Sequence, residues 1–254
     1  MTTLTALHVG GPTLLLRWAG RAVLSDPTFD EPGEYPGGVT LRKLTGPALA
    51  AADLGPLDLA LVSHDQHADN LDVAGRALLA AVPTVVSTTT AAGRLPGVVG
   101  LEPWQSLDLG DDGAAVTAVP ALHGPEDAEA LTGPVVGFLL RAPGAPTVYV
   151  SGDNASVEVA AAIAQRTPDV RLAVLHAGAA NTGRFPEPLT LDAARAVAVA
   201  RLWPRAVVVP VHTDGWAHFT EPVDAVVRAF GDAGLAGRLR VLTPGEETVL
   251  TLPA

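Results

Sequence analysis

The sequence predicts an α/β fold, because short apolar runs typical of strands alternate with Ala-rich segments that have helical periodicity. Three apolar runs between residues 114 and 150 follow one another without a helical segment, so we expect this part of a sheet to be antiparallel. The chain has 254 residues, 48% of them hydrophobic, and can bury a large core. No repeat, low-complexity tract or linker divides it, so we expect one domain over residues 1–254.

The expected elements begin with a hairpin, in which strands 13–17 and 21–25 flank the turn Ala19-Gly20. The segment from Thr28 to about Asp58 is rich in Pro and Gly and long for a connection, so we expect a loop that borders a functional site. Thr190 is expected to be the N-cap of a helix over 191–202. The other expected helices are 71–81, 156–165 and 222–231. The other expected strands are 57–63, 84–87, 114–119, 135–141, 147–150, 172–175, 206–211 and 238–242.

Composition restricts the partners. The formal net charge of −11 argues against a nucleic-acid partner, because Lys and Arg supply most of the affinity for phosphates. The chain has no cysteine, so any metal must be bound by His, Asp, Glu or backbone oxygen. No signal-type N-terminus and no apolar run of about 20 residues is present, so we expect a cytoplasmic protein with no membrane partner. Nothing in the sequence predicts the oligomeric state.

Polar residues of one chemical kind follow several apolar runs. His64 follows LALVS, His123 follows VTAVPAL, Asp153 follows TVYVSG and His212 follows AVVVPV. Each residue alone is more often a turn or cap residue, but the carboxyl ends of strands are where α/β sheets gather ligand-binding groups. Imidazole and carboxylate together suit a divalent ion such as zinc, with manganese and iron as alternatives. The pattern therefore predicts a metal centre.

The amino-acid sequence also resembles a known family over most of its length. The carrying segments are HVGGPTLLL, VLSDPTF, LVSHDQHADNLD, VPALHG, VYVSGDN, VVPVHTDG and LTPGEE. In this order and spacing they resemble the metallo-β-lactamase superfamily, in particular its branch of ascorbate-phosphate lactonase-like hydrolases. The resemblance implies a four-layer αβ/βα sandwich. It also implies the signature His-x-His-x-Asp-His, then a later His, a bridging Asp and a final His, which together bind one or two metal ions.

The resemblance assigns the later ligands directly: His123 matches the later His, Asp153 the bridging Asp and His212 the final His. The segment 64–70, which we call the signature loop, departs from the pattern and allows two alignments. Without a gap, Gln66 takes the place of the second ligand.

With one inserted residue, the loop aligns His64, His67 and Asp69 with the first three ligands and leaves Asn70 in place of the last His. We prefer this gapped alignment because a loop absorbs an insertion easily. Since an amide is a poor substitute for imidazole, we expect at most a weak second metal site. The alternative for Asp69 is an N-cap of the helix that follows.

Further residues are candidates for substrate binding. His176 follows another apolar run and matches a position that lines the pocket in relatives, although a buried structural histidine is an alternative. Trp216 and His218 come just after His212 and are expected to contact substrate, with ordinary packing of that loop as the alternative. His8 is expected to be structural.

The resemblance implies a hydrolase that uses a metal-activated water on a small-molecule ester, lactone, amide or phosphodiester. In this interpretation Asp69 is the catalytic carboxylate that orients or deprotonates the water. One alternative is a metal-dependent oxidoreductase on the same fold. A second is a non-catalytic or metal-free binding protein, which Gln66 and Asn70 suggest because they interrupt the signature.

Overall fold

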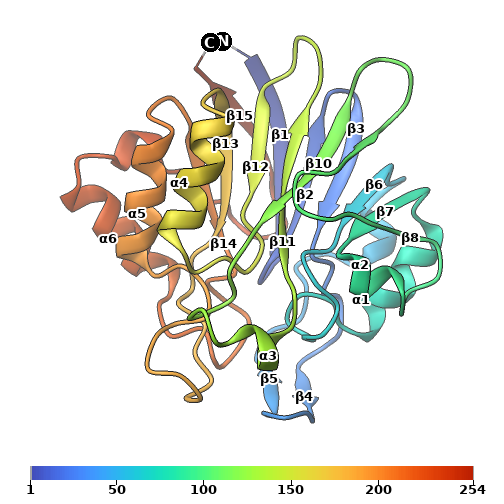
Figure 1. Ribbon diagram of the computed structural model, residues 1–254, viewed down its shortest axis with the longest axis vertical. Coiled ribbons are helices and arrows are strands. Elements are labelled where there is room, and N and C mark those ends of the chain that lie inside the picture. Colours follow the sequence, from blue (N-terminus) through green and yellow to red (C-terminus); the bar gives the residue numbers. More distant parts are fainter. Residues whose placement is uncertain (1, 254) are drawn as a thin grey trace.

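Two β-sheets pack face to face at the centre of the computed structural model, which describes residues 2–253 (Figure 1). The first sheet has the order β15-β1-β2-β3-β6-β7-β8 and the second the order β14-β13-β12-β11-β10-β9. The first sheet consists of β1 (Thr2–Gly10), β2 (Thr13–Trp18), β3 (Arg21–Ser25), β6 (Leu59–Leu61), β7 (Thr84–Ser87), β8 (Val98–Gly100) and β15 (Glu247–Leu252). The second consists of β9 (Ser106–Asp108), β10 (Ala115–Pro120), β11 (Val136–Arg141), β12 (Thr147–Val150), β13 (Val170–His176) and β14 (Val207–Val211).

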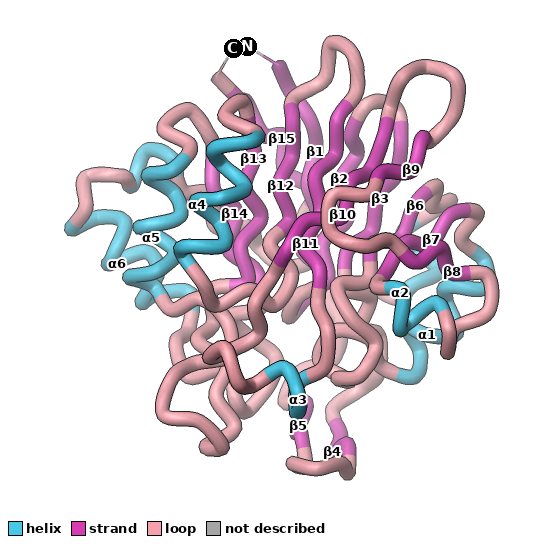
Figure 2. The backbone as a smooth tube through the Cα atoms, in the orientation of Figure 1, coloured by secondary structure: helices cyan, strands magenta, loops and turns pink. Residues whose placement is uncertain are grey.

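Helices cover the outer face of each sheet (Figure 2). Three hydrophobic clusters correspond to the three interfaces between layers, and the one between the sheets contains residues such as Leu61, Phe138 and Val209. The helices over the first sheet are α1 (Val73–Leu78), η2 (Leu79–Ala81) and α2 (Thr89–Ala92). Those over the second are α4 (Val157–Arg166), α5 (Ala193–Leu202) and α6 (Val223–Asp232). The predicted four-layer αβ/βα sandwich is confirmed.

Strand direction places several loops at one end of the sandwich. Strands β3, β6, β7 and β8 are parallel, and so are β12, β13 and β14, whereas β9 to β12 are antiparallel as predicted. The loops that follow β6, β12, β13 and β14 therefore leave the sheets at the same end, the lower end in Figure 1.

Two predicted details are wrong. Residues 238–242 do not form a strand: η3 (Ala236–Arg238) ends there, and Leu239 makes only a single bridge to Val208. Leu242 is buried between the sheets, which explains the apolar pattern without a strand. The N-cap of α5 is Asp192, whose carboxylate accepts from the Arg195 N–H at 2.7 Å, and not Thr190. The edge pair β1 and β15 was not predicted.

The long segment after β3 forms a short hairpin of β4 (Gly33–Tyr35) and β5 (Leu41–Lys43) below the sandwich, followed by η1 (Ala51–Leu54) (Figure 1). A short helix α3 (Glu129–Thr132) also lies at the lower end of the sandwich in Figure 1. No helix within residues 2–253 is long and apolar enough to cross a membrane.

The start of α1 fixes the end of the signature loop. Asp72 is the N-cap of α1 and accepts from the Gly75 N–H at 2.8 Å, so the alternative that Asp69 caps this helix is wrong. Asp72 also pairs with Lys43 of β5 at 2.9 Å, and both side chains are buried. Because a buried pair is costly to break, this contact joins the hairpin to the signature loop firmly.

Candidate metal centre

The signature loop and the loop after β10 bring three histidines together at the lower end of the sandwich. His64 Nε2 lies 2.9 Å from His67 Nδ1, and His123 Nε2 lies 3.3 Å from the same atom. Ligands of a tetrahedral zinc ion lie about 3.3 Å apart, as bond lengths of about 2.0–2.1 Å require. We call His64, His67 and His123 the histidine group; their facing nitrogens could bind one metal ion.

Partners on the outer side fix which nitrogens point inward. His123 Nδ1 donates to the carbonyl oxygen of Leu189 at 2.8 Å, which leaves its Nε2 facing the group. His64 Nδ1 contacts the Ser63 hydroxyl at 3.0 Å, which leaves His64 Nε2 on the inner side. Such contacts are typical of metal-binding histidines because they set the tautomer and the ring orientation.

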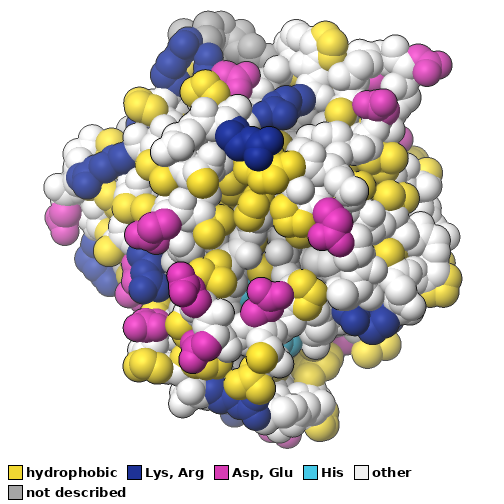
Figure 3. Space-filling view, in the orientation of Figure 1, with side chains coloured by type: hydrophobic (Ala, Val, Ile, Leu, Met, Phe, Trp, Pro, Cys, Tyr) yellow, Lys and Arg dark blue, Asp and Glu magenta, His cyan; other side chains and the backbone are white. Residues whose placement is uncertain are grey.

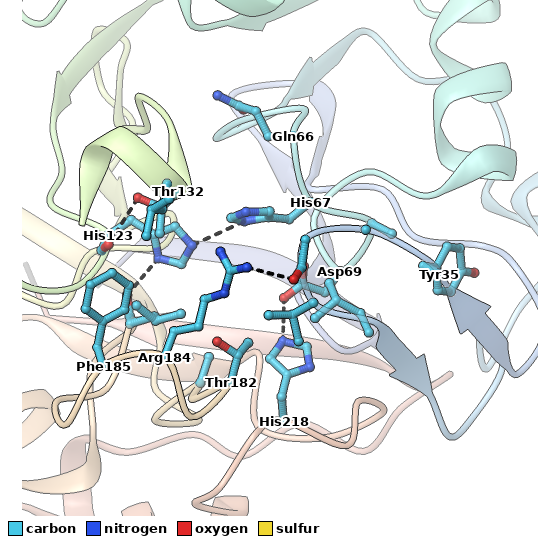
Figure 4. Close-up of a pocket in the computed structure, with 18 of the residues that line it drawn as sticks. Tyr35, Gln66, His67, Asp69, His123, Thr132, Thr182, Arg184, Phe185 and His218 are labelled. Atoms are coloured by element: carbon cyan, nitrogen blue, oxygen red, sulfur yellow. Dashed lines mark hydrogen bonds and ion pairs between the residues drawn. The ribbon is translucent and has the colours of Figure 1, made fainter.

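Gln66 does not belong to this group. Its Oε1 accepts from the Asp65 N–H at 3.0 Å, and Figure 4 shows the side chain directed away from His67 and His123. Asp65 in turn forms an ion pair with Arg94, which fixes the outer side of the loop. The geometry therefore matches the alignment with one inserted residue.

A second set of ligand atoms lies beside the first. We call Asp153, His176 and His212 the carboxylate group; they follow or end β12, β13 and β14, and their side chains are buried. Asp153 Oδ1 lies 2.8 Å from His176 Nδ1 and 3.5 Å from His212 Nε2. Asp153 Oδ2 lies 3.6 Å from His123 Nε2, so this carboxylate stands between the two groups.

Asp69 joins the same cluster from the signature loop. Its Oδ2 lies 2.8 Å from His218 Nε2 and 3.4 Å from His212 Nε2. Asn70 also points inward, and its amide nitrogen donates to Asp153 Oδ1 at 3.1 Å. The structure thus gathers all six residues predicted as metal ligands into one cluster, and adds His176 and His218 to it.

Several atoms of this cluster fit a cation, because they are buried and make no hydrogen bond. Unpartnered polar atoms cost about 1–3 kcal/mol each, and native structures contain few of them. A divalent ion bound among them would remove this cost for those atoms that face it. The atoms are Asp69 Oδ1, Asp153 Oδ2, Asn70 Oδ1, both ring nitrogens of His212, His176 Nε2 and His218 Nδ1.

The electrostatics of the cluster favour the same chemistry. Burial lowers the pKa of His64 well below its ordinary value, and burial lowers those of His67 and His212 as well. Burial alone would raise the pKa of Asp69, but the His218 charge and contacts with His212 hold it well below its usual range. Neutral imidazoles and an ionised carboxylate are the protonation states that bind metals.

Asp26 is a site residue whose role the sequence did not predict. Its Oδ1 accepts from the Ser63 N–H at 2.7 Å, and its Oδ2 lies 3.5 Å from His176 Nε2. Burial raises the pKa of Asp26 to about 7 against the opposing charge of His176. The available signal was the motif SDPTF at the end of β3, which belongs to one of the segments that carry the family resemblance.

Backbone geometry at His212 requires a glycine nearby. His212 has φ of +59°, an uncommon conformation for a residue with a side chain. A Cβ atom on Gly178 would lie 1.9 Å from the His212 carbonyl oxygen, so only glycine fits there. The close approach of these two loops holds the ring of His212 against Asp69 and Asp153.

A pocket of about 220 Å³ opens over the cluster. His67, Asp69, His123 and His218 line it. On the face shown in the space-filling view, only small areas of histidine surface are visible (Figure 3). Its other walls come from the loop at 35–41, the neighbourhood of α3 and the segment 180–189, with the side chains Tyr35, Val39, Leu41, Gln66, Leu131, Thr132, Thr182, Arg184, Phe185 and Leu189. The expectation that the segment after β3 borders the site is confirmed.

Two of the three candidates for substrate binding do not line this pocket. His176 is completely buried behind Asp153. Its two ring nitrogens face the carboxylates of Asp26 and Asp153. Trp216 is 2% exposed and packs against the Tyr35 ring at 5.2 Å and beside Gly11. Of the three, only His218 reaches the pocket, where Figure 4 shows it facing Asp69.

Comparison with known families identifies the chain. The sequence profile of the Beta-lactamase superfamily domain matches residues 21–213, so the chain belongs to this family. This confirms the resemblance predicted from the sequence at the level of the superfamily. Comparison with curated protein sequences gives no significant match.

Solved structures with the same fold include metal-dependent enzymes. The isothiocyanate hydrolase from Delia radicum gut bacteria is 20% identical, with a TM-score of 0.83 over 96% of this chain and 98% of that one. A possible metal-dependent hydrolase from Veillonella parvula is also 20% identical, with a TM-score of 0.85 over 98% and 100%. The diiron β-hydroxylase CmlA from Streptomyces venezuelae is 19% identical, with a TM-score of 0.67 over 98% of this chain and 54% of that one. At these identities the similarity shows the shared fold.

Proposed function

We propose that the chain is a metal-dependent hydrolase of small molecules, with its metal centre at the base of the pocket. The observation that carries the proposal is the histidine group, in which three imidazole nitrogens face one another across 2.9–3.3 Å at the wall of an open pocket. Three imidazole ligands with an open position are characteristic of catalytic zinc sites. A divalent ion in such a site lowers the pKa of a bound water from about 15.7 toward 7 and polarises a carbonyl or phosphoryl oxygen.

The chain's own residues have distinct tasks in this proposal. His64, His67 and His123 bind the ion, with Asp153 Oδ2 on the side that faces His123. Asp69 stays ionised, and its unpartnered Oδ1 accepts the proton of the attacking water or orients that water. In such a hydrolase these groups would surround the bond that is cleaved.

The pocket suits a small substrate with an apolar portion. Leu41, Leu131 and Phe185 supply apolar walls, and Arg184 is the only Lys or Arg among the lining residues. Arg184 extends across the pocket in Figure 4, and its guanidinium donates to the Gly38 carbonyl at 2.7 Å. We therefore extend the proposal to a small-molecule ester, lactone, amide or phosphodiester, among which the fold alone does not select.

The test combines metal analysis with a substrate panel. Protein stripped with a chelator is reconstituted with zinc, manganese or iron, and hydrolysis of matched lactone, ester, amide and phosphodiester probes is measured. We expect metal-dependent hydrolysis of at least one class and its loss in His123→Ala. Failure of every metal to bind would contradict the metal centre. Turnover that requires iron and a reductant, with no hydrolysis, would instead support the alternative that the chain is an oxidoreductase. The diiron β-hydroxylase CmlA, which has a similar fold, is an enzyme of that kind.

A further inference from the structure

We infer that His218 supplies to a second metal ion the imidazole that the signature loop lacks at Asn70. The second site would then consist of Asp69, Asp153, His212 and His218. This inference rests on the proposed metal centre. It also goes against the expectation from the sequence, in which Asn70 leaves at most a weak second site.

The side chain of Asn70 is directed at a carboxylate and not at an open ligand position. Its amide nitrogen donates to Asp153 Oδ1 at 3.1 Å and to the Ser63 hydroxyl at 3.3 Å. His176 contacts the same oxygen of Asp153, which leaves only Oδ2 of that carboxylate without a hydrogen bond. Asn70 therefore orients Asp153 so that Oδ2 faces the ligand cluster.

His218 approaches the cluster from the segment between β14 and α6. Its Nε2 lies 2.8 Å from Asp69 Oδ2, and His212 Nε2 lies 3.4 Å from that same oxygen. Two imidazoles thus meet one carboxylate: the His218 contact is a hydrogen bond, and the His212 distance is close to the separation of about 3.3 Å between ligands of a tetrahedral ion. With Asp153, the set offers two carboxylates and two imidazoles, a combination that suits zinc, manganese or iron.

The segment that carries His218 is well fixed. The Ala217 N–H donates to the Arg42 carbonyl at 2.9 Å, and the His218 carbonyl accepts from the Asn181 N–H at 2.8 Å. Phe219 packs on the rings of both His212 and His218, with centroids 3.8 Å and 4.7 Å away. The side chain of His218 is only 11% exposed, so its ring is presented in one orientation, as a ligand must be.

Three roles for His218 make different predictions for metal binding. A residue that only contacts substrate would leave the affinity for metal unchanged. A residue that only orients Asp69 would change the affinity for the second ion by about 10- to 100-fold. A direct ligand contributes a metal bond, so its loss should exceed that range.

The experiment is a titration of metal-free protein with Co²⁺, followed by visible absorption and by competition with a chelator. We expect two equivalents for the wild type and one for His218→Ala, with the affinity for the second ion reduced by more than about 100-fold. Adding Asn70→His to His218→Ala should restore the second equivalent. If His218→Ala does not fold, His218→Phe takes its place in the titration, because it preserves an aromatic ring.

His8→Gln is the matched control, because His8 is also a buried histidine, but its ring Nε2 lies near Gly11 and Asp214 and not beside the ligand cluster. It should bind two equivalents. A single equivalent in the wild type, or two in His218→Ala with nearly unchanged affinity, would overturn the inference while leaving the proposed function intact. A greater loss in Asn70→Ala than in His218→Ala would also overturn it, since Asn70 Oδ1 would then be the ligand. Absence of any bound ion in the wild type would contradict the proposed function itself.

Discussion

The histidine group and the carboxylate group satisfy their polar atoms in different ways. In the histidine group, the facing atoms are all imidazole nitrogens, and the closest pair is 2.9 Å apart. In the carboxylate group, Asp153 lies between imidazoles and accepts hydrogen bonds from His176 and Asn70. Imidazole nitrogens that face one another can share a single proton or a cation, whereas a carboxylate between imidazoles accepts hydrogen bonds from them.

Because of this difference, we expect the two groups to contribute differently to metal affinity and to the stability of the fold. The histidine group can lose a member without leaving an isolated charge, because burial holds His64 and His67 in the neutral form. The carboxylate group cannot, because Asp153 pairs with the buried His176, whose pKa the hydrogen bond and charge of Asp153 raise against the opposing effect of burial. We therefore expect changes in the first group to act mainly on metal affinity, and changes in the second to act on stability as well.

The largest expected effect is on stability. Asp153→Ala should lower the free energy of unfolding of the metal-free protein by about 3–5 kcal/mol, because it leaves buried partners of a charge without compensation. His123→Ala should lose metal binding with a much smaller loss of stability. Urea denaturation of both metal-free variants measures this, with Asp153→Asn as a control that preserves the shape. Equal losses in the two variants would remove the distinction between the groups.

The next effect is on metal affinity within the signature loop. His67→Ala should weaken binding of the first ion far more than Gln66→Ala, since removal of a ligand exceeds the roughly 10- to 100-fold cost of losing an outer partner. Gln66 contacts Asp65 and not the histidine group, so it is the matched control. Competition with a chelator gives the rank order, and the reverse order would favour the ungapped alignment.

The smallest expected effect is a pH dependence of the metal-free protein. Because burial lowers the pKa of His64, His67 and His212 in the folded state, the unfolded state binds more protons below its histidine pKa of about 6.5. Stability should therefore fall as the pH drops below about 6.5. His64→Gln should reduce this slope by at most about 1.4 kcal/mol per pH unit. A slope unchanged in His64→Gln would contradict the neutral state of that ring.

Most of the fold could be predicted because its inner strands are buried. The strands β7 and β12 were placed at their true bounds, since apolar runs bounded by turn residues mark buried strands. The strands β1 and β15 were missed because they pair at an edge, where β15 alternates between exposed and buried residues near the end of the chain. The run at 238–242 misled because only one of its three apolar residues, Leu242, is fully buried.

The candidate site could be predicted where a polar residue follows an apolar run. His123 and His212 were found in this way, and parallel strands then placed the ends of those runs together. Arg184 and Phe185 could not be found, because they lie on a segment without secondary structure whose position depends on distant contacts such as that with Gly38. His176 follows the same rule as the ligands, but its burial behind Asp153 is a property of the folded chain.

The most direct test of the metal centre is the position of the metal in a crystal of the reconstituted protein, located by anomalous scattering from zinc. We predict a peak about 2.0–2.1 Å from His64 Nε2, His67 Nδ1 and His123 Nε2. An ion at this position would show that the histidine group is a metal site and that the signature loop contains one inserted residue. A crystal with full zinc content and no peak between these three atoms, or with Gln66 as a ligand in place of His67, would contradict it.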